Sequence, residues 1–354
     1  MKKQSVFLVS KLSGYLMACL RELKAQTGCE IMVCHWPVAD EAPFDEVLFK
    51  PIDQRIDKGE ASLESLTKTV LDLEPDFIYI SGWMDKDYLH VGRTARKRGI
   101  PVVGGCDTQW KGGLRQHLAC LIAPWYLHRA IDILWVSGER QREFAKRLGY
   151  VGKNCMEGMY ACDWEAIALN DASAIQQRDK AFLYVGRLME RKGTEVLLEA
   201  YQQYRQRSAS PWPLYLVGTG PMKEAVQNHE GVNDLGFKQP ADLPQVYRRA
   251  SCFIMPSLYE PWGVAIQEAA ANRMPLICSD ACGAAVHLLR DGYNGYKVAT
   301  GNPDELCDAM SSIERLSSDQ RGDFSSRSYE LSKQYTPKLW VVTLSDWLSA
   351  RKQL

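Results

Sequence analysis

The chain has 354 residues, of which 46% are hydrophobic and 24% are charged, a composition that is ordinary for a soluble globular protein of two domains. Its 43 basic and 43 acidic residues cancel, so no global field favours nucleic acid. The eleven cysteines show no CxxC spacing and no Cys/His cluster. This argues against a zinc site and a disulfide framework, and it fits a reducing cytosol.

Targeting and membrane segments are not indicated. The first apolar run, Val6–Val9, is short and is followed by Lys11, so a β-strand explains it better than a signal peptide. The longest apolar zone, residues 114–136, contains charged side chains and histidines and is not a bilayer span.

Strand-like and helix-like segments alternate through the first half of the chain, which predicts a parallel sheet flanked by helices. The predicted strands are SVFLVS, EIMVCHW, PDFIYISGW, IPVVGGC and ILWVSG. The predicted helices cover residues 15–26, 61–73, 87–99, 112–129 and 139–148.

The segment 111–126 places Lys111 and Arg115 among leucine, isoleucine, tryptophan and tyrosine at helical spacing. Such a face could rest on an anionic membrane or hold a lipid-linked acceptor, but core packing is the preferred interpretation. The basic run 93–99 is interpreted as a solvated helix face, with added membrane attraction as the alternative. The polar run 168–180 lacks a strand pattern and is predicted to contain the interdomain linker.

The second half repeats the alternation from Ala181 to about Leu316. In FLYVGRLMERKG an apolar strand ends at Gly186 and is followed by Arg187 and Lys192, two cations that can offset the charge of a diphosphate. In LYLVGTGP the next strand ends at two further glycines, Gly218 and Gly220, which would let the backbone approach a ligand closely.

Glu260 and Glu268 follow a third apolar strand, CFIM, in the stretch EPWGVAIQEAA. Glu260 is predicted in the strand-to-helix loop, and Glu268 about one turn inside the helix, from where its side chain leans back toward the N-terminus. The free N–H groups near Gly263 and Val264 would face an anion with the helix dipole behind them. The spacing alone also fits a solvated helix face.

Taken in order, these motifs resemble the donor-binding domain of family 4 glycosyltransferases, which are retaining enzymes of the GT-B fold that use nucleotide-sugar donors. The resemblance is specific over residues 181–298, including LGF at 235–237 and DGYNGYKV at 291–298, and thin over the first 175 residues. It implies an α/β protein of two doubly wound, Rossmann-like domains that face each other across a cleft.

The resemblance also implies the division of the chain. Residues 1–170 would form the acceptor-side domain, 171–180 the linker and 181–336 the donor-binding domain. A final helix, 337–354, would cross back to the N-terminal domain. Its apolar stripe is predicted to pack, and consists of Trp340, Val341, Leu344, Trp347 and Leu348.

By the same resemblance, Arg187, Lys192 and the amides at Gly263–Val264 would stabilise the leaving diphosphate. Glu260 would hold sugar hydroxyls and Glu268 the ribose. The backbone near Phe237 would contact the base, and the glycines Gly186, Gly218 and Gly220 would line the donor site.

Three positions in the N-terminal half carry open alternatives. Gly14 would belong to the glycine loop that approaches the donor phosphates, or it would lie in an ordinary βα turn. Asp107 stands where the family usually has a histidine near the donor sugar, and it would take that positional role, with Gln109 or Trp110 helping, or cap a loop. The D-x-D of Asp85 and Asp87 is interpreted as a helix cap rather than a metal site.

We therefore predict a retaining transferase that moves a hexose-type sugar from a UDP- or GDP-linked donor to a glycan or lipid-linked acceptor, in bacterial surface polysaccharide or lipopolysaccharide synthesis. The alternatives are a nucleotide-sugar-binding protein without catalysis, and an epimerase- or phosphorylase-type enzyme on the same fold. We expect no metal or other cofactor and no nucleic acid partner. The expected location is the cytoplasm, with peripheral contact at the inner face of the membrane through the N-terminal domain as an open alternative.

Overall fold

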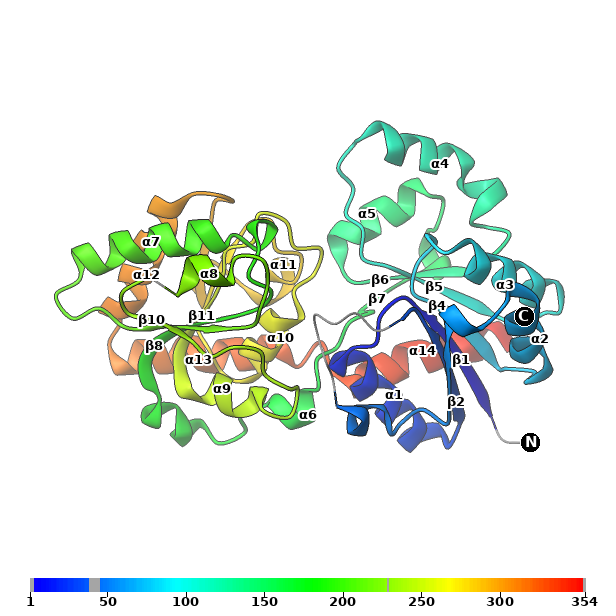
Figure 1. Ribbon diagram of the computed structural model, residues 1–354, viewed down its shortest axis with the longest axis horizontal. Helices are drawn as coiled ribbons and strands as arrows, with labels where there is room; N and C mark the ends of the chain where they lie inside the picture. Colours follow the sequence, from blue (N-terminus) through cyan, green and yellow to red (C-terminus); the bar gives the residue numbers. More distant parts are fainter. Residues whose placement is uncertain (1–2, 38–44, 228, 353–354) are drawn as a thin grey trace. The chain divides into compact units, whose positions relative to one another are not determined.

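The computed structural model describes residues 3–37, 45–227 and 229–352, and the chain divides into two compact units (Figure 1). Unit 1 comprises residues 1–161 and 337–354, and unit 2 comprises residues 162–336. Residues 162–170, expected in the first domain, therefore belong to unit 2. The Asn272 side chain donates a hydrogen bond of 2.7 Å to the carbonyl of Ile167, and the Leu169 amide donates one of 3.1 Å to the carbonyl of Ala271.

The segment predicted as a linker is structured. It contains the 3-10 helix η4 (Ala172–Gln177) and the first residues of strand β8 (Asp179–Val185). A polar sequence without a period of two or 3.6 gives no sign of such short elements. The hydrogen bonds of residues 167 and 169 to a segment about one hundred residues away explain why the boundary lies earlier than predicted.

Unit 1 contains, among its described residues, a seven-stranded sheet in the order β3-β2-β1-β4-β5-β6-β7, with every neighbouring pair parallel. The strands are β1 (Gln4–Val9), β2 (Glu30–His35), β3 (Gln54–Asp57), β4 (Phe77–Ile80), β5 (Val102–Cys106), β6 (Ile133–Val136) and β7 (Cys155–Glu157). The sequence predicted five of them. It missed β3 and β7, the two edge strands, because QRID and CME are short and carry no apolar run.

The helices of unit 1 match the predicted ranges closely. They are α1 (Gly14–Thr27), α2 (Leu63–Asp72), α3 (Lys86–Lys97), α4 (Leu114–Tyr126), α5 (Glu139–Arg147) and α14 (Pro337–Lys352), with the 3-10 helices η1 (Glu46–Phe49), η2 (Lys58–Glu60) and η3 (Gly152–Asn154). Residues 353 and 354 of the predicted final helix lie outside the described residues.

Two apolar clusters cover the two faces of the unit 1 sheet. Successive strand residues point to opposite faces, so Val6 and Leu8 of β1 belong to one cluster, and Phe7 and Val9 belong to the other. The first cluster includes side chains of α2, α3 and α5, and the second includes side chains of α1 and α14. Helices therefore cover both faces, as the prediction of a doubly wound sheet requires.

The final helix α14 packs in unit 1, as predicted. Trp340, Val341 and Leu344 are almost completely buried in the cluster that contains α1. The Trp340 ring stacks on Trp135 of β6 with a centroid distance of 4.6 Å, and its Nε1–H donates a 3.0 Å hydrogen bond to the carbonyl of Met159. The apolar stripe in the last 18 residues is thus used for packing.

Unit 2 contains, in its described part, a six-stranded parallel sheet in the order β10-β9-β8-β11-β12-β13. The strands after β8 are β9 (Leu214–Val217), β10 (Val232–Asp234), β11 (Ala250–Met255), β12 (Leu276–Ser279) and β13 (Gly295–Val298). The helices are α6 (Trp164–Ile167), η5 (Glu190–Lys192), α7 (Thr194–Arg207), α8 (Lys223–Val226), α9 (Leu243–Arg249), α10 (Val264–Ala271), α11 (Ala285–Leu288), α12 (Pro303–Arg315) and α13 (Ser318–Ser332).

The unit 2 sheet lies between two helix layers. Helices α7 and α12 pack together on one face, and α10 packs with α13 and α6 on the other, as Figure 1 shows. The strand order reverses between β8 and β11, the first and fourth strands of this sheet. In open sheets of this kind, ligands bind at the carboxyl ends of the strands where the order reverses. A ligand site is therefore expected at the loops that follow β8 and β11.

Candidate functional site

Three loops of unit 2 meet at the carboxyl ends of β8, β9 and β11. The Leu188 amide, in the loop after β8, donates a 3.0 Å hydrogen bond to the Thr219 carbonyl in the loop after β9. The amides of Leu258 and Tyr259, in the loop after β11, donate hydrogen bonds of 3.0 and 3.2 Å to the carbonyl of Arg191. The loop after β8 is thus held on both sides, and the motifs predicted at three separate strand ends lie next to one another.

The glycines of these loops are required by contacts between the loops themselves. A Cβ atom at Gly218 would lie 1.9 Å from the carbonyl oxygen of Gly186, and one at Gly220 would lie 2.3 Å from that of Leu188. Both glycines also have φ values above +140°. Close approach of backbone to backbone therefore accounts for both glycines and fixes the shape of the loops. Close approach of this backbone to a ligand stays a prediction.

Lys192 and Glu260 form an ion pair between the loops after β8 and β11. The Lys192 ammonium donates a hydrogen bond to Glu260 Oε2. Both side chains are mostly buried, with exposed fractions of 15% and 9%. The two residues were predicted to bind different parts of one ligand. In this structure they bind each other, so the charge of the ammonium is already balanced by a carboxylate.

Helix α10 begins directly after this ion pair. Its N-cap, Gly263, has a φ of 101°, a left-handed conformation that glycine adopts without strain. The Gly283 amide donates a 3.0 Å hydrogen bond to the carbonyl of Glu260 and supports the loop from behind. The first amides of an α-helix have no carbonyl partner within the helix, and here these are the amides of Val264 and Ala265. The Ile266 amide already donates a 3.0 Å hydrogen bond to the carbonyl of Gly263. Together with the helix dipole they favour an anion at this end.

Glu268 lies one turn further along α10 and faces helix α9. Its Oε2 accepts a 2.7 Å hydrogen bond from the hydroxyl of Tyr247. Burial raises the pKa of the Glu268 carboxyl to about 7, the Tyr247 hydrogen bond acts in the opposite direction, and the charge of Asp163 raises the pKa further. Near neutral pH this carboxyl therefore exists in both protonation states, which is unusual for glutamate.

Arg187 and Phe237 occupy the expected loops. Arg187 is exposed, and its carbonyl accepts a 2.8 Å hydrogen bond from the buried Tyr184 hydroxyl, which fixes the backbone at the end of β8. Phe237 follows β10 and is partly exposed. The preceding residue, Gly236, accepts a 2.9 Å hydrogen bond from the Gly218 amide, so this loop is tied to the loop after β9.

The candidates of the N-terminal half lie in unit 1. Gly14 is the first residue of α1, behind the N-cap Ser13, whose hydroxyl oxygen accepts from the Leu16 amide. Asp107 follows β5, and its carboxylate accepts a 3.2 Å hydrogen bond from the hydroxyl of Tyr160. Burial raises the pKa of Tyr160 well above its usual value, so this phenol stays neutral and remains a donor. Both positions are at carboxyl ends of strands in their own sheet.

The two residues proposed to help Asp107 have structural partners. The Gln109 carbonyl accepts a 2.7 Å hydrogen bond from the side chain of Gln116. The Trp110 ring lies against Phe144 at a centroid distance of 5.8 Å, and the guanidinium of Arg147 lies 4.4 Å above it. These contacts anchor the loop before α4 to α5.

The D-x-D motif is a helix cap. Asp85 is the N-cap of α3, and its Oδ1 accepts hydrogen bonds of 2.9 and 3.2 Å from the amides of Asp87 and Tyr88. The other oxygen of Asp85 contacts Lys58 Nζ at 2.8 Å and accepts from Trp36 Nε1 at 2.7 Å. The preferred sequence interpretation, a helix cap, is confirmed by these two amide hydrogen bonds.

The described residues contain neither a metal-binding cluster nor a membrane-spanning helix. No group of three or more His, Cys, Asp or Glu side chains there is arranged to hold a metal ion. Nor does any described helix combine the length and apolar character needed to cross a bilayer. All eleven cysteines are free thiols.

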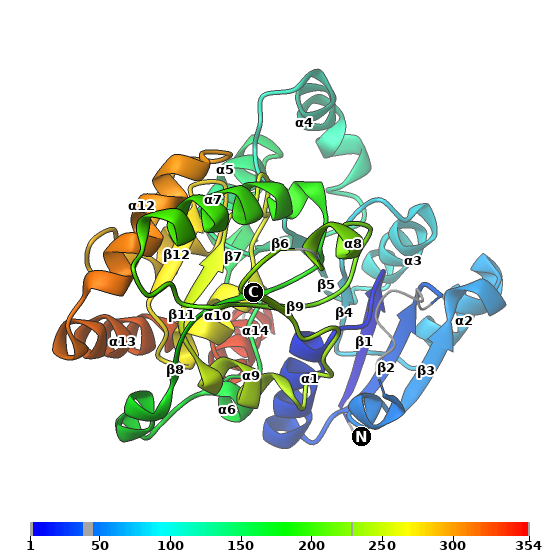
Figure 2. The ribbon, with the colours of Figure 1, turned by 60° about the vertical axis from the view of Figure 1, so that its left-hand side comes forward.

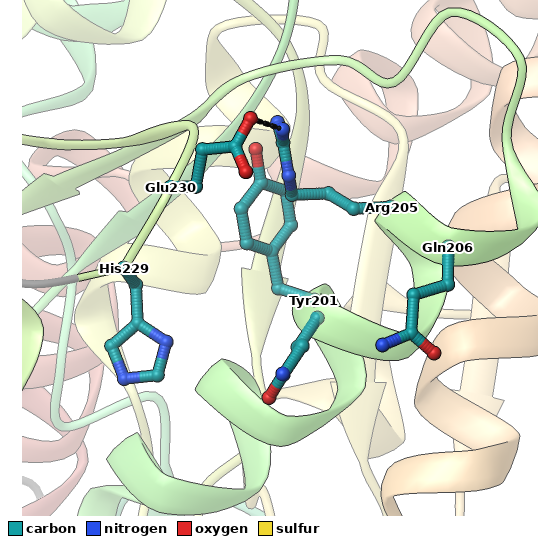
Figure 3. A pocket seen from close by; sticks show the side chains of 6 residues that line it. Tyr201, Arg205, Gln206, His229 and Glu230 are labelled. Atoms are coloured by element: carbon teal, nitrogen blue, oxygen red, sulfur yellow. Dashed lines mark hydrogen bonds and ion pairs between the residues drawn. The ribbon is translucent and has the colours of Figure 1, made fainter.

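A surface hollow of about 500 Å³ lies away from these loops (Figure 3). It is bounded by α7 and the segment before β10, at the amino end of that strand. Three of its six lining side chains bind within the protein: the Tyr201 hydroxyl donates to the carbonyls of Trp212 and Gly231, and Arg205 pairs with Glu230, an ion pair that Figure 3 shows. The hollow is therefore not a candidate for the site predicted from the motifs.

Sequence reasoning missed residues that shape the site from a distance. Tyr247 lies 21 positions before Glu268 and belongs to no motif, so only the fold brings the two together. Thr194 could have been noticed, because a threonine that follows a glycine at the start of a helix is a common partner for loop backbone. Its hydroxyl accepts from the Met189 amide at 3.0 Å and donates to the Met189 carbonyl at 3.1 Å.

Comparisons with known proteins support the motif assignment. Residues 167–331 match the family described as glycosyl transferases group 1. An uncharacterized glycosyltransferase of Methanocaldococcus jannaschii is 30% identical over 44% of this chain and 42% of its own length. The O-antigen chain mannosyltransferase B of Escherichia coli is 30% identical over 44% of this chain and 45% of its own. The chain thus spans less than half the length of these curated relatives.

Among solved structures, Anabaena HepE in complex with UDP is similar over 99% of this chain and 100% of its own, with a TM-score of 0.78 at 19% sequence identity. At that identity the similarity concerns the fold, and it confirms the predicted GT-B class. The matched region contains every candidate residue of unit 2 named above. Residues 167–331 are therefore similar to group 1 glycosyl transferases, and the chain has the GT-B fold.

Proposed function

We propose that this protein is a glycosyltransferase that transfers a hexose-type sugar from a nucleoside-diphosphate sugar to a glycan or lipid-linked acceptor with retention at the anomeric carbon. The observation that carries the proposal is the convergence of Arg187, the Lys192–Glu260 ion pair and Glu268 on the loops and helix that follow β8 and β11. The match of this region to group 1 glycosyl transferases supports it. Retention follows from the resemblance to family 4.

The Lys192–Glu260 pair is suited to exchange partners when a donor binds. Removing a mostly buried charge from its partner without replacement is costly, so both groups must find substitutes together. A donor supplies both: its pyrophosphate oxygens can accept from the Lys192 ammonium, and its sugar hydroxyls can donate to the Glu260 carboxylate. The pair holds both side chains in place before the ligand arrives, which reduces the entropic cost of binding.

Charge relief on the leaving diphosphate is the main chemical requirement. As the bond from the anomeric carbon to the phosphate oxygen breaks, negative charge grows on that oxygen. Arg187, Lys192 and the first amides of α10, at Gly263 and Val264, would lie around it. The acceptor hydroxyl would attack on the same face, and its proton would pass to the leaving phosphate oxygen.

Glu268 would bind the ribose of the donor. A ribose presents two hydroxyl groups, and a carboxylate can accept from both only when it is ionised. Because the Glu268 pKa is about 7 in the unliganded protein, donor binding should release a proton near neutral pH. The base would lie against the backbone near Phe237, in the loop tied to β9 by the Gly218–Gly236 hydrogen bond.

The donor, the acceptor and the location are proposed from the relatives and from the chemistry. UDP is the first donor nucleotide to test because Anabaena HepE binds UDP, and GDP is the second. The E. coli relative is named an O-antigen chain mannosyltransferase, which supports a role in bacterial surface polysaccharide synthesis. Such donors are made in the cytoplasm, where we place the protein.

The same donor chemistry needs no metal, because protein cations and the helix end supply the positive potential. Turnover should therefore persist in excess chelator. Complete loss that added magnesium or manganese restores would contradict metal independence.

The direct test is a donor turnover assay with UDP- and GDP-hexoses and a panel of saccharide and lipid-linked acceptors. Arg187→Ala and Glu268→Ala should each lower turnover by roughly two to three orders of magnitude, the usual effect of removing one group that stabilises developing charge or positions the donor. Arg207→Ala is the matched control, since this exposed arginine on α7 pairs with Asp308 away from the loops.

The same assay separates the alternatives. Tight donor binding without turnover in any acceptor panel would identify a binding protein. Release of the nucleotide, or epimerisation of the sugar, without transfer to an acceptor would identify an epimerase- or phosphorylase-type enzyme. Wild-type rates in both variants would exclude the proposed site whichever activity is found.

A further inference from the structure

Helix α4 exposes an apolar face to solvent. Leu114, Leu118, Leu121, Ile122 and Trp125 recur at intervals of three, four and one along the helix and so lie on one side of it. Their exposed fractions range from 42% for Ile122 to 88% for Leu114. A single exposed leucine is ordinary, but five large apolar side chains on one helix face mark an interaction surface.

The opposite face of α4 holds the helix on unit 1. Ala123 is fully buried there, and Ala119, Cys120 and Tyr126 pack against the core cluster that contains α2, α3 and α5. Small residues and Tyr126 face inward, whereas the leucines, Ile122 and Trp125 face outward, which is not the arrangement of an ordinary surface helix. The preferred sequence interpretation, that the large apolar residues pack in the core, is therefore wrong. Figures 1 and 2 both show α4 at the outer end of unit 1, beyond α5.

Positive charge surrounds this face. The segment 108–131 contains Lys111, Arg115 and Arg129, all exposed, and no acidic residue, although the whole chain has no net charge. Arg93 of α3 lies 5.0 Å from the ring of Tyr126 and Arg147 of α5 lies 4.4 Å from the ring of Trp110, and both support the ends of the helix.

The carboxylates on the elements packed beside α4 are already paired. Glu143 of α5 contacts Arg147 at 2.8 Å, and Asp132 contacts Arg96 at 2.9 Å. In α5, as in the segment 108–131, basic residues outnumber acidic ones, so the formal charge of the sequence beside the apolar face is positive, which complements an anionic surface.

We propose that α4 docks on the surface of an anionic lipid bilayer, lying in the plane of the headgroups with its apolar face inserted. At 13 residues it is about 20 Å long, too short to span a hydrocarbon core of about 30 Å. Leucine, isoleucine and tryptophan on one face with lysine and arginine beside them are the composition of interfacial helices.

The inference does not depend on the proposed function, because lipid binding can be measured without donor or acceptor. Flotation with phosphatidylcholine vesicles, with and without phosphatidylglycerol, measures the partition of the full chain. The wild type should bind the vesicles that contain phosphatidylglycerol, and binding should fall as salt is added, because the Debye length shortens.

Two variants test the two parts of the surface. Replacing Lys111, Arg115 and Arg129 together by glutamine should weaken partition roughly 100-fold, since each cation near an anionic surface contributes about fivefold. Replacing Leu118, Leu121 and Trp125 by serine should weaken it at least as much. The matched control replaces three exposed lysines away from α4 by glutamine, namely Lys50, Lys180 and Lys297.

Because the changed side chains are exposed, all three variants should melt at the wild-type temperature. The proposal is overturned if either α4 variant is folded and still partitions onto the vesicles like the wild type. It is also overturned if the wild type does not bind anionic vesicles. A wild type that forms dimers, which the serine variant converts to monomers, without binding vesicles would assign the face to contact between copies of the chain and would also overturn it.

Discussion

Glu268→Gln offers a test of the buried carboxyl on α10 that requires no substrate. In the folded protein the Glu268 pKa is raised to about 7 from a usual value of 4.5, chiefly because burial disfavours the charged form. The neutral form is therefore favoured by folding. The contribution of Glu268 to stability is fully present below about pH 4.5 and is lost as the pH rises through 7.

The size of the effect follows from the difference in pKa. At about 1.4 kcal/mol for each pH unit, ionising Glu268 costs the folded state about 3 kcal/mol. This is an upper figure, because the residue as a whole is only partly buried although its carboxyl group is desolvated. Glutamine has the shape of the neutral acid and cannot ionise. Relative to the wild type, Glu268→Gln should therefore gain up to about 3 kcal/mol between pH 4.5 and pH 8.

Thermal melting across this pH range measures the difference. For a domain of 150–250 residues, about 3 kcal/mol corresponds to a relative rise in Tm of roughly 6–12 °C. Glu199→Gln, at an exposed position on α7, is the matched control and should melt in parallel with the wild type. Tyr247→Phe should enlarge the effect, because its hydroxyl stabilises the ionised form. If Tm changed with pH in the same way for the wild type and Glu268→Gln, the raised pKa of Glu268 would be refuted.

Three other outcomes follow from the structure. Lys192→Met or Glu260→Gln alone should lower the free energy of unfolding by roughly 3 kcal/mol, as urea denaturation measures. The loss in the double variant should be roughly 1–3 kcal/mol smaller than the sum of the two single losses. Strict additivity of the two losses would mean that the ion pair does not form in solution. Gly218→Ala should lower the free energy of unfolding by about 3 kcal/mol or more, because the new Cβ would lie 1.9 Å from a carbonyl oxygen. Gly112→Ala should lower it by only about 1–2 kcal/mol, because Gly112 has a positive φ but open space around it. Trp340→Ala should cost about 3–5 kcal/mol in unit 1, since this buried ring stacks on Trp135; a loss under about 1 kcal/mol would show that α14 does not pack as described.

Local sequence patterns were enough to predict the architecture. Buried parallel strands appear in the sequence as apolar runs, and the helices between them appear as amphipathic stretches. The strands that contain Val6–Val9 and the residues before Gly186 were found in this way. The edge strands β3 and β7 were missed because they have only four and three residues, too few to form a recognisable apolar run. The boundary near residue 162 was missed because it depends on hydrogen bonds to α10, about one hundred residues away.

The sequence predicted which loops carry the candidate residues, because each motif is contiguous in the chain. It did not predict the contacts that these residues make with residues from distant segments. The sequence placed Lys192 and Glu260 at strand ends, but their mutual ion pair follows from the adjacency of β8 and β11 in the sheet. Gly218 was marked as a position where the backbone comes close to another group, and the structure shows such an approach to the Gly186 carbonyl. Its approach to a ligand stays a prediction. The pKa of Glu268 depends on burial by α9, which no spacing in the sequence encodes.

The face of α4 was misjudged for a related reason. An apolar helical stripe normally predicts the side that packs on the core. Here Ala123 and its small neighbours pack, and the large residues, such as Leu114 and Trp125, remain exposed. Periodicity identifies the faces of a helix, but only the tertiary structure shows which face is covered.

Calorimetric titration of UDP and GDP into the wild-type protein and into Arg187→Ala and Glu268→Ala is the most direct measurement of the donor site. We predict that one nucleotide binds the wild type, releases protons near pH 7 as Glu268 ionises, and binds each variant at least tenfold more weakly. The same affinity and the same proton release in all three proteins would contradict a donor site at the carboxyl ends of β8 and β11.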